Sequence, residues 1–172
     1  LQWLGGIGII VMAIAVFPML RVGGMQLFRM ESSDTSEKVL PRAAQIASSI
    51  GLIYLILTFI CATAYWLAGM SGFDAVAHSM TTIATGGYST NDGSLGNFDS
   101  WSIDLIATIG MLVGSLPFTL YLKTLRGSYA ALWQDPQVQW FMSIVCIIVL
   151  SITVWLWLSS SLTPAQALRY AS

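Results

Sequence analysis

Charged side chains are scarce in this sequence of 172 residues, at 9% of the chain against 56% hydrophobic residues. A soluble domain carries about 25% charged residues, so this chain cannot build a surface that faces water. The 7 Lys and Arg residues stand against 8 Asp and Glu residues, giving a net charge of −1. The chain therefore lacks the excess of Lys and Arg that a nucleic-acid-binding protein needs, which excludes that class. The composition therefore indicates an integral membrane protein.

Cysteine and histidine are also rare. The two cysteines, Cys61 and Cys146, both lie inside apolar runs, which excludes a disulfide scaffold and the paired Cys and His spacing of a zinc site. The one histidine, His78, has no second histidine with which to share a metal, so we interpret it as a neutral, hydrogen-bonded packing residue. Because no nucleophile–base pair is visible either, we expect neither an enzyme nor a cofactor.

Long uncharged intervals predict four transmembrane helices, because about 20 apolar residues cross a bilayer as a helix and backbone groups in lipid must be satisfied within the segment. The predicted helices cover residues 2–28, 44–68, 101–123 and 138–158. We expect Pro117 to kink the third helix or to end its regular part. The chain opens without a Met or a basic signal-peptide region, and we expect it to be an internal fragment of a longer protein.

Lys and Arg residues predict the orientation of these helices. Six of the seven occur in and beside the connections 29–43 and 124–137, whereas residues 68–103 contain none and carry Asp74, Asp92 and Asp99. By the positive-inside rule, the two basic connections are cytoplasmic linkers and the acidic stretch is external. We expect Asp92 and Asp99 to be solvated charges, with Asp92 a candidate for attracting cations at an outer mouth.

The external stretch contains a short helix, predicted over residues 72–83. Ser71 followed by Asp74 resembles a capping box, and apolar residues recur behind it at helical spacing. Twelve helical residues are too short to cross a bilayer, so the helix can enter the membrane but not span it. Residues 84–88 form a glycine-rich strand that must lead back outside.

This arrangement has two interpretations from the residues alone. The C-terminal end of a half-helix carries partial negative charge, and the glycines of Thr85-Gly86-Gly87 allow a positive φ and let backbone carbonyls face one axis, where they can replace the hydration shell of a cation. The same glycines also suit an ordinary external loop. Composition and spacing do not decide between a pore loop and such a loop.

Several segments resemble the Trk/Ktr/HKT superfamily of potassium transporters, and most closely its bacterial Trk-type membrane subunit. These segments are Gln2–Val11, Val22–Leu27, Pro41–Arg42 and Gly69–Thr90. The resemblance runs across essentially the whole chain and favours the pore-loop interpretation.

The resemblance implies an all-α integral membrane fold of helix–pore loop–helix repeats, arranged as a pseudo-tetramer like a potassium channel. It divides the chain into the closing helix of repeat one (1–28), a linker (29–43), the complete repeat two (44–123), a second linker (124–137), and the opening helix and pore-helix start of repeat three (138–172). Within repeat two, the pore helix is 72–83 and the filter is 84–88. We also pair Ala75 with Ala167 as matching pore-helix positions.

The resemblance also implies the ion site. The family's filter strand matches Ala84, Thr85, Gly86 and Gly87, with the backbone carbonyls of Thr85 and Gly86 as the potassium ligands and Gly86 as the key glycine. Potassium is then the transported substrate, and no cofactor is implied. Residues 114–117 depart from the pattern expected for this family.

The predicted function is uptake of potassium across the inner membrane, as part of a larger multi-pass Trk-type transporter. The implied partners are the remaining repeats of the same chain, a second copy in a homodimer, a cytoplasmic nucleotide-binding regulatory subunit and membrane lipid, with no nucleic acid. The alternative is a non-transporting membrane scaffold or accessory subunit that keeps a degenerate pore loop. Three further loops with a central glycine in the parent reading frame would favour the transporter.

Overall fold

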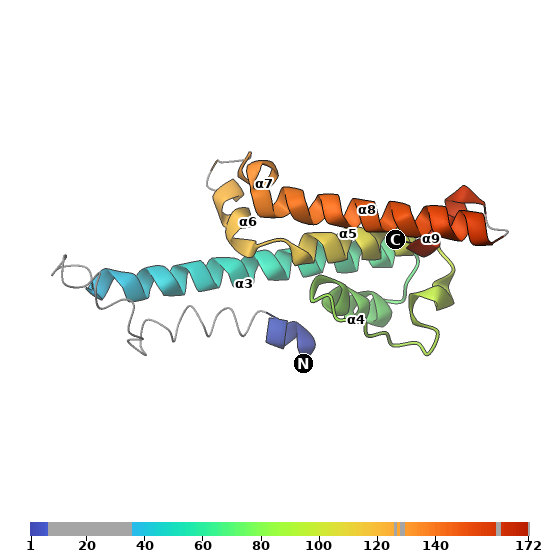
Figure 1. Ribbon diagram of the computed structural model, residues 1–172. Helices are drawn as coiled ribbons and strands as arrows, with labels where there is room; N and C mark the ends of the chain where they lie inside the picture. The colour runs from blue at the N-terminus through green and yellow to red at the C-terminus, as the bar shows by residue number, and fades with distance from the viewer. Residues whose placement is uncertain (7–35, 126, 128–129, 161–162, 172) are drawn as a thin grey trace.

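The structure is a computed structural model that describes residues 1–6, 36–125, 127, 130–160 and 163–171 (Figure 1). Its regular elements in these ranges are helical, and residues 2–6 are helical as well. The elements are α3 (Ser36–Leu67), α4 (Gly72–Ile83), the 3₁₀ helix η1 (Ser94–Phe98), α5 (Trp101–Ser115), α6 (Phe118–Leu125), α7 (Ala131–Gln134), α8 (Pro136–Ser159) and α9 (Pro164–Ala171). This content matches the all-α fold class predicted from the sequence.

Two of the described helices are long and apolar enough to cross a membrane, namely the Gln45–Leu67 part of α3 and the whole of α8. They correspond to the predicted spans 44–68 and 138–158. The first predicted span, 2–28, lies outside the described residues except for its first few positions. The bounds of α4 coincide with the short helix predicted over 72–83.

The third predicted span, 101–123, is broken and is not one helix. Its two parts, α5 and α6, meet at an angle of 86°. Leu116 ends α5 in an extended conformation, with φ −76° and ψ 148°, because the residue before a proline is disfavoured in the helical region. Pro117 then cannot donate a backbone hydrogen bond that would continue α5. The predicted range 101–123 is thus divided between two helices, and the break lies at Pro117, where the sequence predicts a kink or the end of the regular part.

The core of the described residues lies where α3, α4 and α5 meet. Tyr54, Cys61 and Tyr65 are buried along one face of α3, at spacings of seven and four residues that place them on one stripe of a helix. They join a buried cluster with Ala75 of α4 and Ala107 of α5. This cluster packs the short helix α4 against both α3 and α5 (Figure 1).

The first residues of the chain pack on the middle of α3. The Trp3 indole N–H donates to the Thr58 hydroxyl at 3.1 Å, and the Tyr54 hydroxyl donates to the Trp3 carbonyl at 3.2 Å. The rings of Trp3 and Tyr54 are also in contact, with centroids 5.3 Å apart. The predicted repeat one therefore meets repeat two through a specific set of contacts.

Two glycines let α5 approach the C-terminal end of α4. A Cβ placed on Gly110 would lie 2.6 Å from the Thr82 Cγ2 atom, and one on Gly114 would overlap the backbone carbonyl of Ile83. Small residues four apart are a common device for close helix packing in membranes. Gly114, which departs from the expected family pattern, thus has a packing role beside the end of α4.

Candidate ion-binding loop

The N-terminus of α4 carries the cap that the sequence predicts. Ser71 is extended, and its side chain accepts a hydrogen bond from the Asp74 backbone N–H at 3.1 Å. The Ser71 hydroxyl also donates to the Asp74 carboxylate at 2.7 Å. These contacts satisfy a free N–H of the first turn and place a negative charge at the positive end of the helix dipole.

Asp74 also fastens the segment that follows the predicted filter. The Thr90 hydroxyl donates to the second carboxylate oxygen of Asp74 at 2.6 Å. Hydrogen bonds from Thr90 and then Ser71 lower the pKa of Asp74 below its usual value, because they stabilise the charged form of the carboxyl group. Asp74 is therefore a cap and a tether, and it lies at the opposite end of α4 from the predicted filter.

The C-terminus of α4 leads into a sharp change of backbone direction. The N–H groups of Ala84, Thr85 and Gly86 donate back to the carbonyls of Met80, Thr82 and Thr81, respectively. Thr85 then has φ 50° and Gly87 has φ 70°. A positive φ is uncommon for a residue other than glycine, and such conformations persist where the surroundings enforce them. After this turn the chain runs without regular structure to Ser89.

Four successive carbonyl groups after this turn have no partner within the part of the chain that the structure describes. Among the described residues, no hydrogen-bond donor meets the carbonyl oxygens of Ala84, Thr85, Gly86 or Gly87. Backbone carbonyls at membrane depth cost free energy unless a protein group, water or an ion satisfies them. The loop is therefore a run of available oxygen ligands at the negative end of a helix.

Gly86 differs from the conformational expectation for this loop. It does not have a positive φ, which occurs instead at its neighbours Thr85 and Gly87. What restricts Gly86 is contact, because a Cβ placed on it would lie 2.8 Å from the side-chain oxygen of Gln2. A residue of the predicted repeat one thus packs against the predicted key glycine of repeat two.

His78 connects α4 to residues 86–90, a segment without regular secondary structure that we call the returning strand. Its side chain is buried, with Nδ1 2.8 Å from the Asp74 carbonyl and Nε2 2.9 Å from the Ser89 hydroxyl. A carbonyl can only accept, so we assign the proton to Nδ1, and Nε2 of the neutral ring accepts from Ser89. This agrees with the interpretation of His78 as a packing residue and adds a link that the sequence did not reveal. No set of three His, Cys, Asp or Glu side chains in the described ranges could hold a metal ion.

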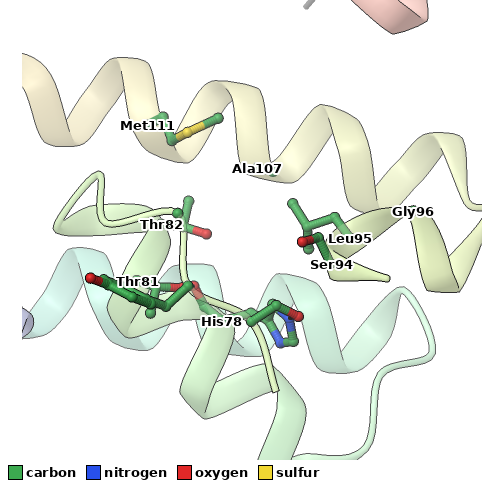
Figure 2. Close-up of a pocket in the computed structure, with 11 residues that line it drawn as sticks. His78, Thr81, Thr82, Ser94, Leu95, Gly96, Ala107 and Met111 are labelled. Atoms are coloured by element: carbon green, nitrogen blue, oxygen red, sulfur yellow. Dashed lines mark hydrogen bonds between the residues drawn. The ribbon is translucent and has the colours of Figure 1, made fainter. Parts of the chain in front are cut away.

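A cavity of about 220 Å³ lies beside the returning strand. Figure 2 shows His78, Thr81 and Thr82 of α4 on one side, with residues of η1 and α5 around the rest. The strand residues Gly87, Tyr88 and Ser89 also line it. The cavity therefore separates this side of the returning strand from η1 and α5. The strand is held in place by the hydrogen bonds that Ser89 makes with His78 and Thr90 makes with Asp74.

The predicted outer charges have different surroundings. Asp92 is exposed in the turn before η1, and its role at an outer mouth stays a prediction. Asp99 is exposed too, but it is not simply a solvated charge, because its carboxylate lies 3.0 Å from the Arg169 guanidinium. Arg169 also contacts Asp104 at 2.6 Å. Sequence reasoning missed this pair, since no local pattern connects residues 65 positions apart.

The start of the predicted third pore helix resembles that of α4. Thr163 and Gln166 form reciprocal hydrogen bonds before α9, with the Thr163 N–H 3.1 Å from the Gln166 side-chain oxygen and the Gln166 N–H 3.4 Å from the Thr163 hydroxyl. This is a capping box at the position equivalent to Ser71 and Asp74 when Ala75 is paired with Ala167. Those two alanines are both buried, at 1% and 0% exposure.

Comparison with known proteins gives a consistent result. The TrkH family of cation transport proteins matches residues 1–168. The Trk system potassium uptake protein TrkI of Halomonas elongata is 49% identical over 90% of this chain and 32% of its own length. The corresponding TrkH protein of Escherichia coli K12 is 45% identical over 91% of this chain and 33% of its own length.

The same relationship holds for a solved structure. The crystal structure of the potassium transporter TrkH from Vibrio parahaemolyticus has a TM-score of 0.80 and 39% sequence identity, and the match covers 99% of this chain and 34% of that one. The chain thus spans about a third of the length of the relatives it matches. With a family match over nearly all its residues, the chain belongs to the TrkH family of cation transport proteins.

Proposed function

We propose that this chain contributes one selectivity-filter segment to a potassium uptake protein of the inner membrane. The observation that carries the proposal is the run of four carbonyl oxygens, from Ala84 to Gly87, that no donor in the described residues satisfies. Carbonyl oxygens are suitable ligands for a dehydrated monovalent cation. The names of the relatives, potassium uptake proteins of Trk systems, support potassium as the substrate.

The electrostatics of α4 favour a cation at this place. The macrodipole puts partial negative charge at the C-terminal end of α4, directly before Ala84. The only acidic side chain of α4 is Asp74, at its other end, so the site would be built from backbone and not from carboxylates. Thr85 and Gly86 are the proposed core ligands, and the positive φ values of Thr85 and Gly87 turn the backbone away from the helix so that its carbonyls are left available.

One segment cannot surround an ion, so the site needs further repeats. We propose that the remaining repeats of a multi-pass chain about three times this length complete the ring of carbonyls, in line with the length of the relatives. We further propose, from the family resemblance, that the complete protein works as a homodimer with a cytoplasmic nucleotide-binding regulatory subunit. We expect residues 1–172 alone not to form a selective pore.

A matched pair of glycine substitutions in the full-length protein tests the proposed site. A Cβ on Gly86 would displace the Gln2 side chain, whereas a Cβ on Gly96 meets no atom within 4 Å. Gly86→Ser should therefore lower the preference for potassium over sodium about tenfold or more, which corresponds to about 1.4 kcal/mol. Gly96→Ser should leave it nearly unchanged. The measurement is rubidium uptake with and without competing sodium, at equal protein levels in the membrane.

Two outcomes would contradict the proposal at different levels. If the unmodified full-length protein gives no rubidium uptake above that of cells lacking it, the proposed function is wrong. If uptake occurs but Gly86→Ser behaves like the unmodified protein while Gly96→Ser is impaired, the protein is a transporter and its ion site lies elsewhere.

A further inference from the structure

Arg169 of α9 and Asp104 of α5 form a charged contact between two predicted repeats. The Arg169 Nε atom donates to the Asp104 carboxylate at 2.6 Å, and an Nη atom lies 3.0 Å from the Asp99 carboxylate. The side chains of Arg169 and Asp104 are 20% and 24% exposed, whereas that of Asp99 is 88% exposed. Short, half-shielded contacts between a guanidinium and a carboxylate are among the stronger hydrogen bonds in proteins.

Arg169 distinguishes α9 from α4. The two helices begin with equivalent caps, and the offset that pairs Ala75 with Ala167 pairs Arg169 with Ala77. Thus α9 carries a cation at the position where α4 has the methyl group of Ala77. The predicted orientation places α9 on the external side, where Lys and Arg are otherwise absent from residues 68–103. A cation in this position needs a reason, and its carboxylate partner on α5 supplies one.

The contact joins two parts of the molecule that have few other links. Within the described residues, α8 packs chiefly against α9 and α7, and an apolar 18-residue window of α8 has 0% of its residues buried. Repeat two is organised around α3, α4 and α5 instead. Arg169 therefore ties the α8–α9 hairpin to α5 near its start, at a point remote in sequence from the connection through α7.

The helix α5 links Asp104 to the predicted filter, because the same helix packs against the end of α4. Asp104 lies in the first turn of α5, and α5 touches the last residues of α4 at Gly110 and Gly114. Thr82 and Ile83, which those glycines contact, directly precede Ala84. The start of the third half-helix and the filter segment of the second are thus held by the same helix.

We propose that Arg169 is a positioning residue for ion selection: through Asp104, it fixes the third half-helix against α5 and so sets where the third filter segment stands relative to Thr85 and Gly86. The inference rests on the proposed function. We assign Asp99 no part in this positioning, because it lies outside α5 in a left-handed conformation with φ 36° and an exposed ion pair contributes little.

A double-mutant cycle in the full-length protein tests the proposal. Arg169→Gln and Asp104→Asn should each lower the preference for potassium over sodium about three- to tenfold in rubidium uptake, and the double variant should be no worse than either single variant. Arg169→Lys keeps the charge but not the planar fork, and should recover part of the loss. Protein levels in the membrane are measured in parallel, so that selectivity is compared at equal abundance.

Two charge-removing controls define the specificity of the effect. Asp99→Asn removes the exposed partner, and Lys123→Gln removes a cation from the last turn of α6; both should leave the potassium preference unchanged. If Arg169→Gln does not accumulate in the membrane, the potassium preferences of Asp104→Asn and Arg169→Lys test the same contact. Unchanged selectivity in these variants, or additive losses in the double variant, would overturn the role of Arg169. Because the unmodified protein and Gly86→Ser are assayed alongside, that result is distinguishable from a failure of the proposed function.

Discussion

The helices α3 and α8 have similar apolar composition but very different surroundings. Both contain a stretch that is long and apolar enough to span a membrane, yet 33% of an apolar 18-residue window in α3 is buried within the described residues, against 0% of such a window in α8. Their hydroxyl groups show how the difference arises. On α3, the Thr58 hydroxyl donates to the Tyr54 carbonyl of its own helix but also accepts from the Trp3 indole, and the Tyr65 hydroxyl meets that of Thr82 on α4. On α8, the hydroxyls of Ser143, Ser151 and Thr153 all donate to carbonyls of their own helix.

Apolarity thus makes both helices candidate spans, and among the described residues α3, unlike α8, also has hydroxyl groups bonded to other elements. A hydroxyl bonded within its own helix is satisfied wherever that helix lies, so it specifies no neighbour. A hydroxyl bonded to another helix is satisfied in one arrangement only, and leaving it unpaired in an apolar interior is costly. The three predictions that follow perturb the contacts of α4 with its neighbours and compare each with a site that lacks such contacts.

The largest effect is expected for alanine at the closest approach of two helices. A Cβ on Gly114 would overlap the Ile83 carbonyl, which belongs to backbone and cannot rotate away, whereas a Cβ on Gly51 of α3 meets no atom within 4 Å. Gly114→Ala should destabilise the full-length protein by about 1–3 kcal/mol through overpacking. Gly51→Ala should stabilise it by up to about 1 kcal/mol, because alanine is the better helix former. Thermal unfolding of the detergent-solubilised protein measures both.

Because the two alanine variants are expected to change the stability in opposite directions, a single measurement can contradict the prediction. If the two alanine variants unfold at the same temperature, α5 does not approach α4 as closely as the structure shows. The loss in Gly114→Ala should also reduce uptake, since the displaced residue, Ile83, lies directly before the proposed filter segment.

An intermediate effect is expected for the buried hydrogen bond between α3 and α4. The Tyr65 and Thr82 hydroxyls lie 2.8 Å apart, and Tyr65 is fully buried. Tyr65→Phe and Thr82→Val should each destabilise the protein by about 1–2 kcal/mol, because each leaves one buried hydroxyl unpaired. The double variant should cost less than the sum of the two, since it removes both polar groups together.

The matched control for this bond is Thr153→Val on α8. Its hydroxyl donates only to the Val149 carbonyl of the same helix, so the same chemical change should shift the unfolding temperature little. Equal losses in Thr82→Val and Thr153→Val would show that contacts between helices contribute no more than contacts within one.

Local features of this molecule were predictable from the sequence, and long-range contacts were not. The bounds of α4 followed from the cap at Ser71 and Asp74 and from apolar spacing, both of which are set within a few residues. The sequence predicted that Pro117 kinks or ends the third helix. It did not predict the size of the bend at Leu116, because that angle depends on how α6 packs against α3. The close approach of α5 to α4 could also have been predicted, because Gly110 and Gly114 are small residues spaced four apart.

The contacts around the proposed filter had no such local signal. Gln2 and Gly86, or Asp104 and Arg169, are brought together by the arrangement of whole helices, so neither pair is visible from spacing alone. The conformational expectation for Gly86 shows the same limit. Glycine suggested a positive φ, but the structure places positive φ at Thr85 and Gly87, and the reason for a small residue at 86 is the neighbouring side chain.

The smallest effect is expected at the N-terminus of α4, where Asp74 of the first turn can be compared with Asp135, the N-cap of α8. Asp74 accepts hydrogen bonds from Ser71 and from Thr90 of the returning strand, whereas Asp135 accepts one from the Gln137 N–H at the start of α8. Asparagine caps helices about as well as aspartate. Asp135→Asn should therefore leave the unfolding temperature unchanged at neutral pH, and Asp74→Asn should lower it slightly by weakening the tether to Thr90.

The pH dependence of that difference identifies its cause. Because the pKa of folded Asp74 lies below its ordinary value of 3.8, the ionised carboxylate stabilises the folded state above that value, and the stabilisation is lost as the pH falls through the lower, folded pKa. The gap in unfolding temperature between the unmodified protein and Asp74→Asn should thus be constant above about pH 5 and close below the ordinary pKa. Thermal unfolding of both proteins across this range measures it. A gap that already closes at neutral pH, or that persists unchanged in strong acid, would mean that ionised Asp74 does not hold the returning strand.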